Sequence, residues 1–194
     1  SSDLFYKGKN KILLTVHDTL FLEMPAYYSR TDRLYNYFAL LISLRRSDRI
    51  ICVSNYTKYS LMRRFPSLLN KEIGVVYNPV EVNATSAKDK RLFDFGYFLS
   101  VSNRQPRKNL KKTIDGFLMS EAARNGIKLV LIGTSDGVDD YTADDRIVDL
   151  GYVDDHTLSS LYMFSDGLLF FSLGEGFGYP ILEAASFGVP VFAA

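Results

Sequence analysis

Two glutamates and four glycines give the segment from Gly174 to Pro190 the clearest potential for chemistry in this sequence. Glycine lacks a Cβ, so a ligand can approach the backbone closely where glycines such as Gly176 cluster. Glu175 and Glu183 border the same predicted crevice. Each carboxylate can accept hydrogen bonds from neighbouring hydroxyls, one from a hexose and the other from a ribose. A glycine-rich turn with two solvated glutamates is the alternative.

A helix is predicted to start within this segment. Pro180 suits the first turn of a helix, and Gly188 suits the position after its end. The backbone N–H groups of Phe177 and Gly178 then point out of the helix N-terminus, where an anion or sugar hydroxyls can bind. The glycines alternate with other residues and follow a late strand, so the segment is not a dinucleotide-binding fingerprint.

A basic loop, Ser102–Asn109, follows another predicted strand and contains Arg104, Arg107 and Lys108. Three cations at the carboxyl end of a strand would neutralise a diphosphate without a metal ion. A basic helix start exposed to solvent is the alternative. Cations at a helix start oppose the macrodipole, however, and a bound anion removes that conflict.

His17 closes a third predicted strand, where it is either a functional group or a hydrogen-bonded loop residue. The only other histidine, His156, looks like part of a helix start, so a histidine-rich metal site is excluded. No Asp-x-Asp triplet occurs, which disfavours the metal-assisted mechanism of single-domain sugar transferases. The single cysteine, Cys52, lies in an apolar run and is interpreted as a buried hydrophobe. No metal and no cofactor are expected.

The elements that must position these residues alternate as βα units do in a mainly parallel sheet, which predicts an α/β fold. Short apolar runs predict strands at Lys11–Val16, Arg49–Val53, Ile73–Tyr77, Tyr97–Val101, Lys128–Ile132, Gly167–Phe171 and Val189–Ala193. Amphipathic stretches predict helices at Thr31–Arg45, Asn55–Phe65, Leu110–Glu121, Asp155–Phe164 and Pro180–Phe187. In the first of these helices, residues at helical spacing are interpreted as a core stripe: Leu34, Tyr37, Phe38, Leu41 and Ile42.

A polar, Pro-broken stretch at residues 78–90 predicts a linker between two domains. The domains are placed at residues 1–83 and 96–194, with the linker at 84–95. Each half supplies fewer strands than the five or six of a doubly wound domain, so both are expected to be incomplete.

Composition excludes several classes of protein. Lys and Arg total 23 and Asp and Glu total 22, so the net charge of +1 creates no field that would draw the chain to nucleic acid. No apolar stretch approaches the roughly 20 residues that cross a bilayer, and no signal-peptide pattern opens the chain. A cytoplasmic location is expected.

The sequence resembles the retaining glycosyltransferases of the two-Rossmann (GT-B) fold, in their group 1 or family 4 class, and it is mannosyltransferase-like. Glu175 and Glu183 match that family's pattern of a Glu, seven residues and a Glu. Further similar segments follow in the family's order: Val16–Asp18, Ser47–Ser54, Val76–Val80, Pro106–Leu110, Gly151–Val153 and Leu161–Phe171. The resemblance implies that residues 1–83 are the last part of the acceptor-side domain and that residues 96–194 are the donor-binding domain.

The resemblance also implies roles for matching residues. Lys108 would bind the donor diphosphate, Glu183 the ribose hydroxyls and Glu175 the transferred sugar. Further donor contacts would come from Gly176 and the amides of Phe177 and Gly178, from His17 facing the sugar across the interdomain cleft, and from the backbone near Val153. Arg104 lies one position after the arginine of the family pattern and is the candidate for a second phosphate contact.

The expected activity is transfer of a hexose from a nucleotide-diphosphate sugar to a glycan or lipid-linked acceptor, with retention of configuration, in cell-surface polysaccharide synthesis. No nucleic acid partner is expected. A location at the inner face of the membrane, with a peripheral contact through residues upstream of Ser1, stays open. A nucleotide-sugar epimerase or a phosphorylase of the same fold, and a non-catalytic nucleotide-sugar-binding module, are the alternatives.

Overall fold

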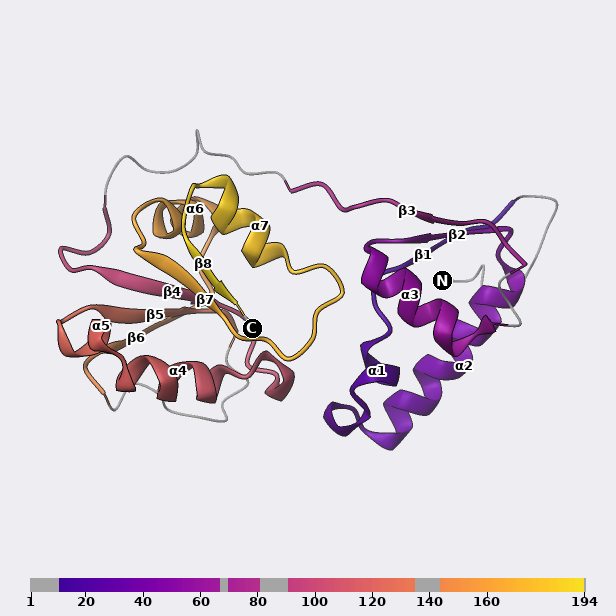
Figure 1. Ribbon diagram of the computed structural model, residues 1–194, viewed down its shortest axis with the longest axis horizontal. Coiled ribbons are helices and arrows are strands. Elements are labelled where there is room, and N and C mark those ends of the chain that lie inside the picture. The colour runs from indigo at the N-terminus through magenta and orange to yellow at the C-terminus, as the bar shows by residue number, and fades with distance from the viewer. Residues whose placement is uncertain (1–10, 67–69, 81–90, 135–143, 194) are drawn as a thin grey trace. The chain divides into compact units, whose positions relative to one another are not determined.

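The computed structural model describes residues 11–66, 70–80, 91–134 and 144–193, which form an α/β chain with parallel sheets (Figure 1). The chain divides into two compact units. The first consists of residues 1–79 with 174–177, and the second of residues 80–173 with 178–194. Each unit has its own sheet and its own core. The predicted fold class is therefore confirmed.

The first unit contains a three-stranded parallel sheet in the order β1-β2-β3. Its strands are β1 (Leu13–Val16), β2 (Arg49–Cys52) and β3 (Ile73–Val75). Its helices are α1 (Leu20–Glu23), the 3₁₀ turn η2 (Pro25–Tyr27), α2 (Arg30–Arg46) and α3 (Asn55–Arg64). Serines start both longer helices, because Ser29 Oγ accepts from the Asp32 amide and Ser54 Oγ from the Thr57 amide.

The core of the first unit lies between one face of this sheet and the helices. Buried residues of β1 and β2 meet buried residues of α2 and α3 there: Val16, Leu44, Ile50, Cys52 and Leu61, with Phe65 just after α3. Cys52 is buried, as predicted, and burial raises the pKa of its thiol above the usual value. The cysteine therefore serves packing.

The interpretation of the stripe on α2 as core is wrong for its first half. Leu34 is 59% exposed and Phe38 is 51% exposed. The helix instead turns Leu40, Leu41 and Leu44 toward the core. Helical spacing identifies an apolar face, but it does not decide which of two adjacent faces packs inward.

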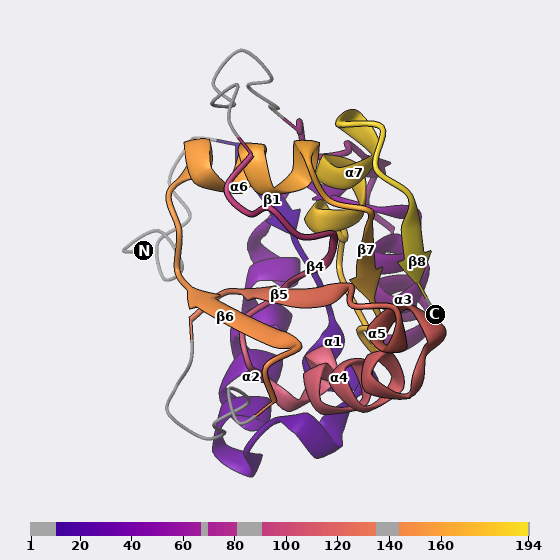
Figure 2. The ribbon, with the colours of Figure 1, turned by 90° about the vertical axis from the view of Figure 1, so that its left-hand side faces the viewer.

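The second unit contains a five-stranded parallel sheet in the order β6-β5-β4-β7-β8. Its strands are β4 (Tyr97–Val101), β5 (Lys128–Ile132), β6 (Ile147–Gly151), β7 (Gly167–Phe170) and β8 (Val191–Ala193). Its helices are the 3₁₀ turn η5 (Pro106–Lys108), α4 (Leu110–Met119), α5 (Glu121–Arg124), α6 (Asp155–Met163) and α7 (Tyr179–Ser186). Figure 2 shows α6 and α7 over one face of this sheet and α4 and α5 over the other.

Two apolar clusters fill the spaces between these layers. One joins the sheet to α6 and α7 and includes Tyr97, Leu99, Leu161, Tyr162 and Ala184. The other joins the opposite face to α4 and α5. Both faces of the sheet are thus buried, which explains why its strands are almost uninterrupted apolar runs.

The predictions for the second unit need correction at one strand and one helix. The strand β6 was not predicted, because Asp149 interrupts its short apolar run and the strand lies at the sheet edge. The predicted helix Leu110–Glu121 ends at Met119, and a separate helix starts at Glu121, since Ser120 Oγ accepts from the Ala123 amide as an N-cap.

The predicted domain limits stay predictions. The two compact units part between Pro79 and Val80, and residues 84–90 of the predicted linker lie outside the described residues. Within the described ranges, none of the helices combines the length and apolar character that crossing a bilayer requires.

Candidate functional site

The basic loop that follows β4 is fixed against the carboxyl end of β7. Pro106 opens the turn η5, and Asn109 ends it in the left-handed conformation, with φ of 58°, which asparagine tolerates better than most residues. The Asn109 side chain donates to the Phe171 carbonyl at 3.1 Å, and the Leu173 amide donates to the Arg107 carbonyl at 2.9 Å. Lys108 is therefore presented beside the strand that leads into the glycine-rich segment.

The ammonium group of Lys108 lies 5.9 Å from the centre of the Phe170 ring. This distance permits a cation–π contact between the two side chains. Lys108 is half-buried, so its charge is only partly screened by water. The loop thus places the positive charge of Lys108 near the carboxyl ends of β4 and β7.

Arg104 lies in the same loop but is engaged by a carboxylate. Its guanidinium donates to Asp149 on β6, and the two side chains are only 8% and 16% exposed. Asp149 also accepts from the Gly151 amide at 3.0 Å, which holds the carboxylate in place. The pair links the β4 loop to β6 across the end of β5. Asp149 is a single acid within an apolar run, and that pattern alone does not identify Arg104 as its partner.

The N-terminus of α7 follows the prediction. Gly178 precedes the helix with φ of 85°, a left-handed conformation that suits glycine, and Pro180 lies in the first turn. At the other end, Gly188 has φ of 71°, and the Val189 amide donates to the Ala184 carbonyl at 2.9 Å. Glycine and proline set both limits of this helix.

Glu183 lies one turn inside α7 and is half-buried. Its Oε2 accepts a hydrogen bond of 2.9 Å from the hydroxyl of Tyr162, a residue of α6 that is 1% exposed. Burial, followed by the negative charge of Glu183, raises the pKa of Tyr162 above the usual range, so the hydroxyl stays a donor. In the sequence, Tyr162 lies within the family-like segment Leu161–Phe171, and no pattern there marks it as the partner of Glu183.

The glycines at 174–177 pack with the first unit, beside the end of β1. Ser54 Oγ donates to the Gly176 carbonyl at 2.8 Å, and the Phe177 and Tyr77 rings lie 6.3 Å apart. A Cβ on Gly176 would lie 2.5 Å from the His17 carbonyl oxygen, so the backbones meet where only glycine fits. The predicted residues His17 and Gly176 are therefore neighbours.

The predicted site residues thus fall into two groups. His17, Glu175, Gly176 and Phe177 belong to the first unit, and the others, Arg104, Lys108, Val153, Gly178 and Glu183, belong to the second. Val153 packs against the core cluster below α6. Among the described residues, no three His, Cys, Asp or Glu side chains gather as a metal ion would require.

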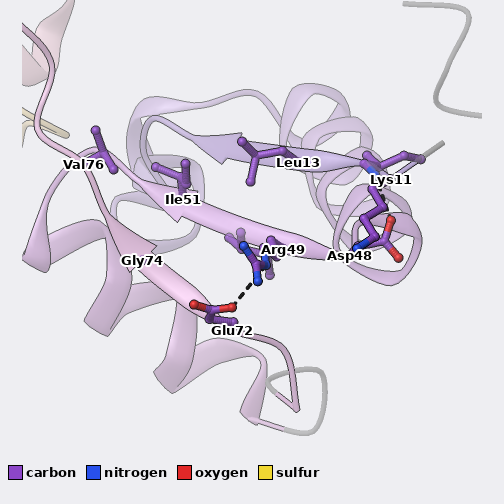
Figure 3. A pocket seen from close by; sticks show the side chains of 10 residues that line it. Lys11, Leu13, Asp48, Arg49, Ile51, Glu72, Gly74 and Val76 are labelled. Carbon is purple, nitrogen blue, oxygen red and sulfur yellow. Dashed lines mark hydrogen bonds and ion pairs between the residues drawn. The ribbon is translucent and has the colours of Figure 1, made fainter.

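Described residues of the first unit line at least two hollows. One, of about 420 Å³, is lined by His17, Asp18, Tyr28, Asn36 and Ser43 among others, and so contains one predicted site residue. The other, of about 640 Å³, lies on the sheet face that the helices leave uncovered (Figure 3). Figure 3 shows the ion pair of Arg49 and Glu72 there, at 3.1 Å. This second hollow contains none of the predicted site residues.

Comparison with known proteins identifies the family. The family model described as "Glycosyl transferases group 1" matches residues 84–194, more than half of the chain, and "Glycosyltransferase Family 4" matches residues 4–84. The chain belongs to the group 1 glycosyltransferases. The resemblance inferred from the sequence motifs is thereby confirmed.

Two curated relatives of this glycosyltransferase are mannosyltransferases. The O-antigen chain mannosyltransferase B of Escherichia coli is 28% identical over 215 residues, covering 97% of this chain and 56% of that protein. The O-antigen chain mannosyltransferase RfbU of Salmonella typhimurium is 28% identical over 190 residues, covering 93% of this chain and 51% of that protein. The chain therefore spans about half the length of the curated relatives it matches.

Solved structures of glycosyltransferases share the fold. The sucrose-phosphate synthase of Thermosynechococcus elongatus has a TM-score of 0.75 at 20% identity, covering 99% of this chain and 52% of that one. WaaG, a glycosyltransferase involved in lipopolysaccharide biosynthesis, has a TM-score of 0.64 at 16% identity, covering 95% and 57%. These similarities confirm the GT-B type of α/β fold.

Proposed function

We propose that this glycosyltransferase transfers a hexose, with retention of configuration, from a nucleotide-diphosphate sugar to a glycan or lipid-linked acceptor in cell-surface polysaccharide synthesis. Mannose is the hexose we propose, since both curated relatives are O-antigen chain mannosyltransferases. The observation that carries the proposal is the placement of Lys108 against the end of β7, the strand that leads into the glycine-rich segment before α7.

The proposed chemistry stabilises the leaving diphosphate. As the bond between the hexose and the diphosphate breaks, negative charge grows on the phosphate oxygens, and the sugar becomes oxocarbenium-like. Lys108 and the amides at the start of α7 offer positive charge and N–H donors to that developing charge. These groups are held in place before the reaction, so little reorganisation is needed at the transition state.

The acceptor is proposed to attack on the face from which the diphosphate departs. The new glycosidic bond forms as the old one breaks, and the acceptor hydroxyl gives its proton to a donor phosphate oxygen. No side chain of the protein needs to act as a covalent nucleophile. Glu175 and His17 orient the hexose, Glu183 binds the ribose hydroxyls, and the backbone near Val153 contacts the base.

Arg104 is proposed to act differently from Lys108. Because its guanidinium is engaged by Asp149 in a buried pair, its charge is already compensated. We propose that the Arg104 guanidinium contacts a donor phosphate while it stays paired with Asp149. The ion pair also holds the loop in shape. Lys108 is proposed to supply a further phosphate contact from the same loop.

The test is the substitution Lys108→Ala, with Lys112→Ala on the exposed side of α4 as its control. We expect Lys108→Ala to weaken binding of a nucleoside diphosphate by roughly 10- to 100-fold, which corresponds to the loss of a hydrogen bond to a charged group. Lys112→Ala should bind as the wild type does. Calorimetric titration with GDP, UDP and ADP measures both.

Sugar transfer is then measured with nucleotide sugars and glycan acceptors. Equal binding and equal transfer by Lys108→Ala and Lys112→Ala would show that Lys108 does not bind the diphosphate. Conversion of a nucleotide sugar without any second sugar acceptor would instead favour an epimerase.

A further inference from the structure

The hydrogen bond between Tyr162 and Glu183 joins two helices that cover the same face of the second sheet. Tyr162 comes from α6 and Glu183 from α7, and the oxygen atoms are 2.9 Å apart. A hydrogen bond to a carboxylate is stronger than one between neutral groups. A buried tyrosine hydroxyl needs a partner, and here that partner is a group proposed to bind the ligand.

The ring of Tyr162 is held by packing, so the hydroxyl has a fixed position. It stacks on Phe187 with ring centres 5.8 Å apart and planes 13° apart. Tyr162 also belongs to the core cluster that includes Leu161 and Ala184. Side chains in such a core keep one rotamer, so the Tyr162 hydroxyl can fix the rotamer of a neighbouring flexible acid.

Glu183 is the flexible partner in this pair. A glutamate on a helix surface rotates about three bonds, and its terminal torsion is broad. The bond from Tyr162 engages Oε2 and restrains that torsion, so that Oε1 can accept from a ligand.

We infer that Tyr162 is a positioning residue, which holds the Glu183 carboxylate in the orientation that accepts hydrogen bonds from the ribose hydroxyls of the donor nucleotide. This inference rests on the proposed function, because it takes the ribose contact of Glu183 from there. Tyr162 is then part of the site as a buried residue that does not itself contact the nucleotide. The selection of a ribose over a deoxyribose depends on it.

The test compares two tyrosines from the same core. Tyr162→Phe removes the hydroxyl beside Glu183. Tyr97→Phe removes an equally buried hydroxyl that donates to the Leu161 carbonyl at 2.9 Å. Both substitutions delete one oxygen from the cluster under α6, so their effects on stability should be similar. Only the first one removes a partner from the proposed ribose contact.

The readout is the affinity of the full chain for GDP, UDP and ADP and for their 2′-deoxy counterparts, by calorimetric titration. We expect the wild type and Tyr97→Phe to prefer the ribonucleotide. For Tyr162→Phe we expect roughly a three- to tenfold loss of ribonucleotide affinity, the size of one hydrogen bond, and a smaller loss for the 2′-deoxy form, which keeps only the 3′-hydroxyl contact. The ratio of the ribonucleotide affinity to the 2′-deoxynucleotide affinity should therefore fall toward one.

A double substitution sharpens this expectation. In a Glu183→Ala background, Tyr162→Phe should have no further effect on nucleotide affinity, because the group that it positions is gone. If Tyr162→Phe does not fold, Phe187→Leu takes its place. It loosens the ring that carries the hydroxyl and leaves Glu183 unchanged, so the ribose preference should again fall.

The outcomes separate the two levels of the proposal. If the wild type binds none of these nucleotides, the proposed function fails. If the wild type binds and prefers the ribonucleotide while Tyr162→Phe matches Tyr97→Phe, the function stands and the positioning role of Tyr162 is overturned. An undiminished ribose preference in Phe187→Leu would overturn it as well.

Discussion

At the scale of single residues, Gly133 shows how closely the strand ends of the second unit pack. It follows β5 with φ of 133°, and a Cβ there would lie 2.0 Å from the Ser102 carbonyl oxygen. That carbonyl belongs to the loop that carries Lys108. A side chain at position 133 would therefore push this loop away from β5.

We expect Gly133→Ala to destabilise the second unit by roughly 2 to 4 kcal/mol, since it adds both overpacking and an unfavourable backbone conformation. Gly116→Ala is the control. A Cβ on Gly116, inside α4, meets nothing within 4 Å, so alanine should stabilise the helix by roughly 0.5 to 1 kcal/mol. Denaturant unfolding measures both changes, and equal stability of the two variants would contradict the close packing at Gly133.

At this scale, the sequence could predict the features that single prolines and glycines determine. Pro180 and Gly188 act through their own backbone preferences, so the limits of α7 were predictable. The partners of Arg104 and Glu183 were not predictable. Asp149 and Tyr162 lie 45 and 21 positions away along the chain, and only folding brings them together.

At the scale of elements, strands buried on both faces were the easiest to predict. Tyr97–Val101 and Lys128–Ile132 match β4 and β5 from end to end, because a buried strand needs an uninterrupted apolar run. The edge strand β6 has no such run. The direction of the apolar stripe on α2 also could not be predicted, since it depends on the position of the sheet below the helix.

A polar network joins α1 to α3 in the first unit. Ser60 Oγ donates to Glu23 Oε1 at 2.6 Å, and Arg63 pairs with the other carboxylate oxygen at 2.8 Å. The hydrogen bond from Ser60, with charge from Arg63 and Arg64, lowers the pKa of Glu23 below its ordinary value of 4.5. The resulting stability is present above that value and is lost as the pH falls through the lowered pKa.

We expect Ser60→Ala to cost roughly 1 to 2 kcal/mol at neutral pH, because it removes a hydrogen bond to a charged group. The variant should also lose less stability than the wild type when the pH falls below 4.5, since its Glu23 is less well stabilised as a carboxylate. Thermal unfolding at pH 6 and pH 3 measures both effects. Ser43→Ala, which removes a bond to the Ala39 carbonyl, is the control and should keep the acid dependence of the wild type.

At the scale of the whole molecule, charge is balanced, with 23 cationic and 22 acidic side chains. The proposed attraction of a diphosphate therefore depends on local groups such as Lys108 and the start of α7. Local cations and helix amides can neutralise a diphosphate without a divalent ion. In the proposed mechanism, these protein groups neutralise the diphosphate in place of a metal ion.

We expect hexose transfer to keep most of its rate in the presence of EDTA, and nucleotide binding to weaken as salt screens Lys108. Initial rates with and without EDTA, and titrations at two ionic strengths, test both expectations. A loss of more than about tenfold in EDTA that Mg²⁺ or Mn²⁺ restores would contradict the metal-independent mechanism.

The strand order of the second unit reverses beside β4. From there the chain proceeds outward to β5 and β6, and then returns to the other side of β4 for β7 and β8. The chain leaves β4 toward α4 and leaves β7 toward α7. In open α/β sheets, ligands bind at the strand ends where the order reverses in this way. Substitutions in these two loops leave every strand pair of the sheet in place, so the proposed donor contacts can change while the framework stays the same.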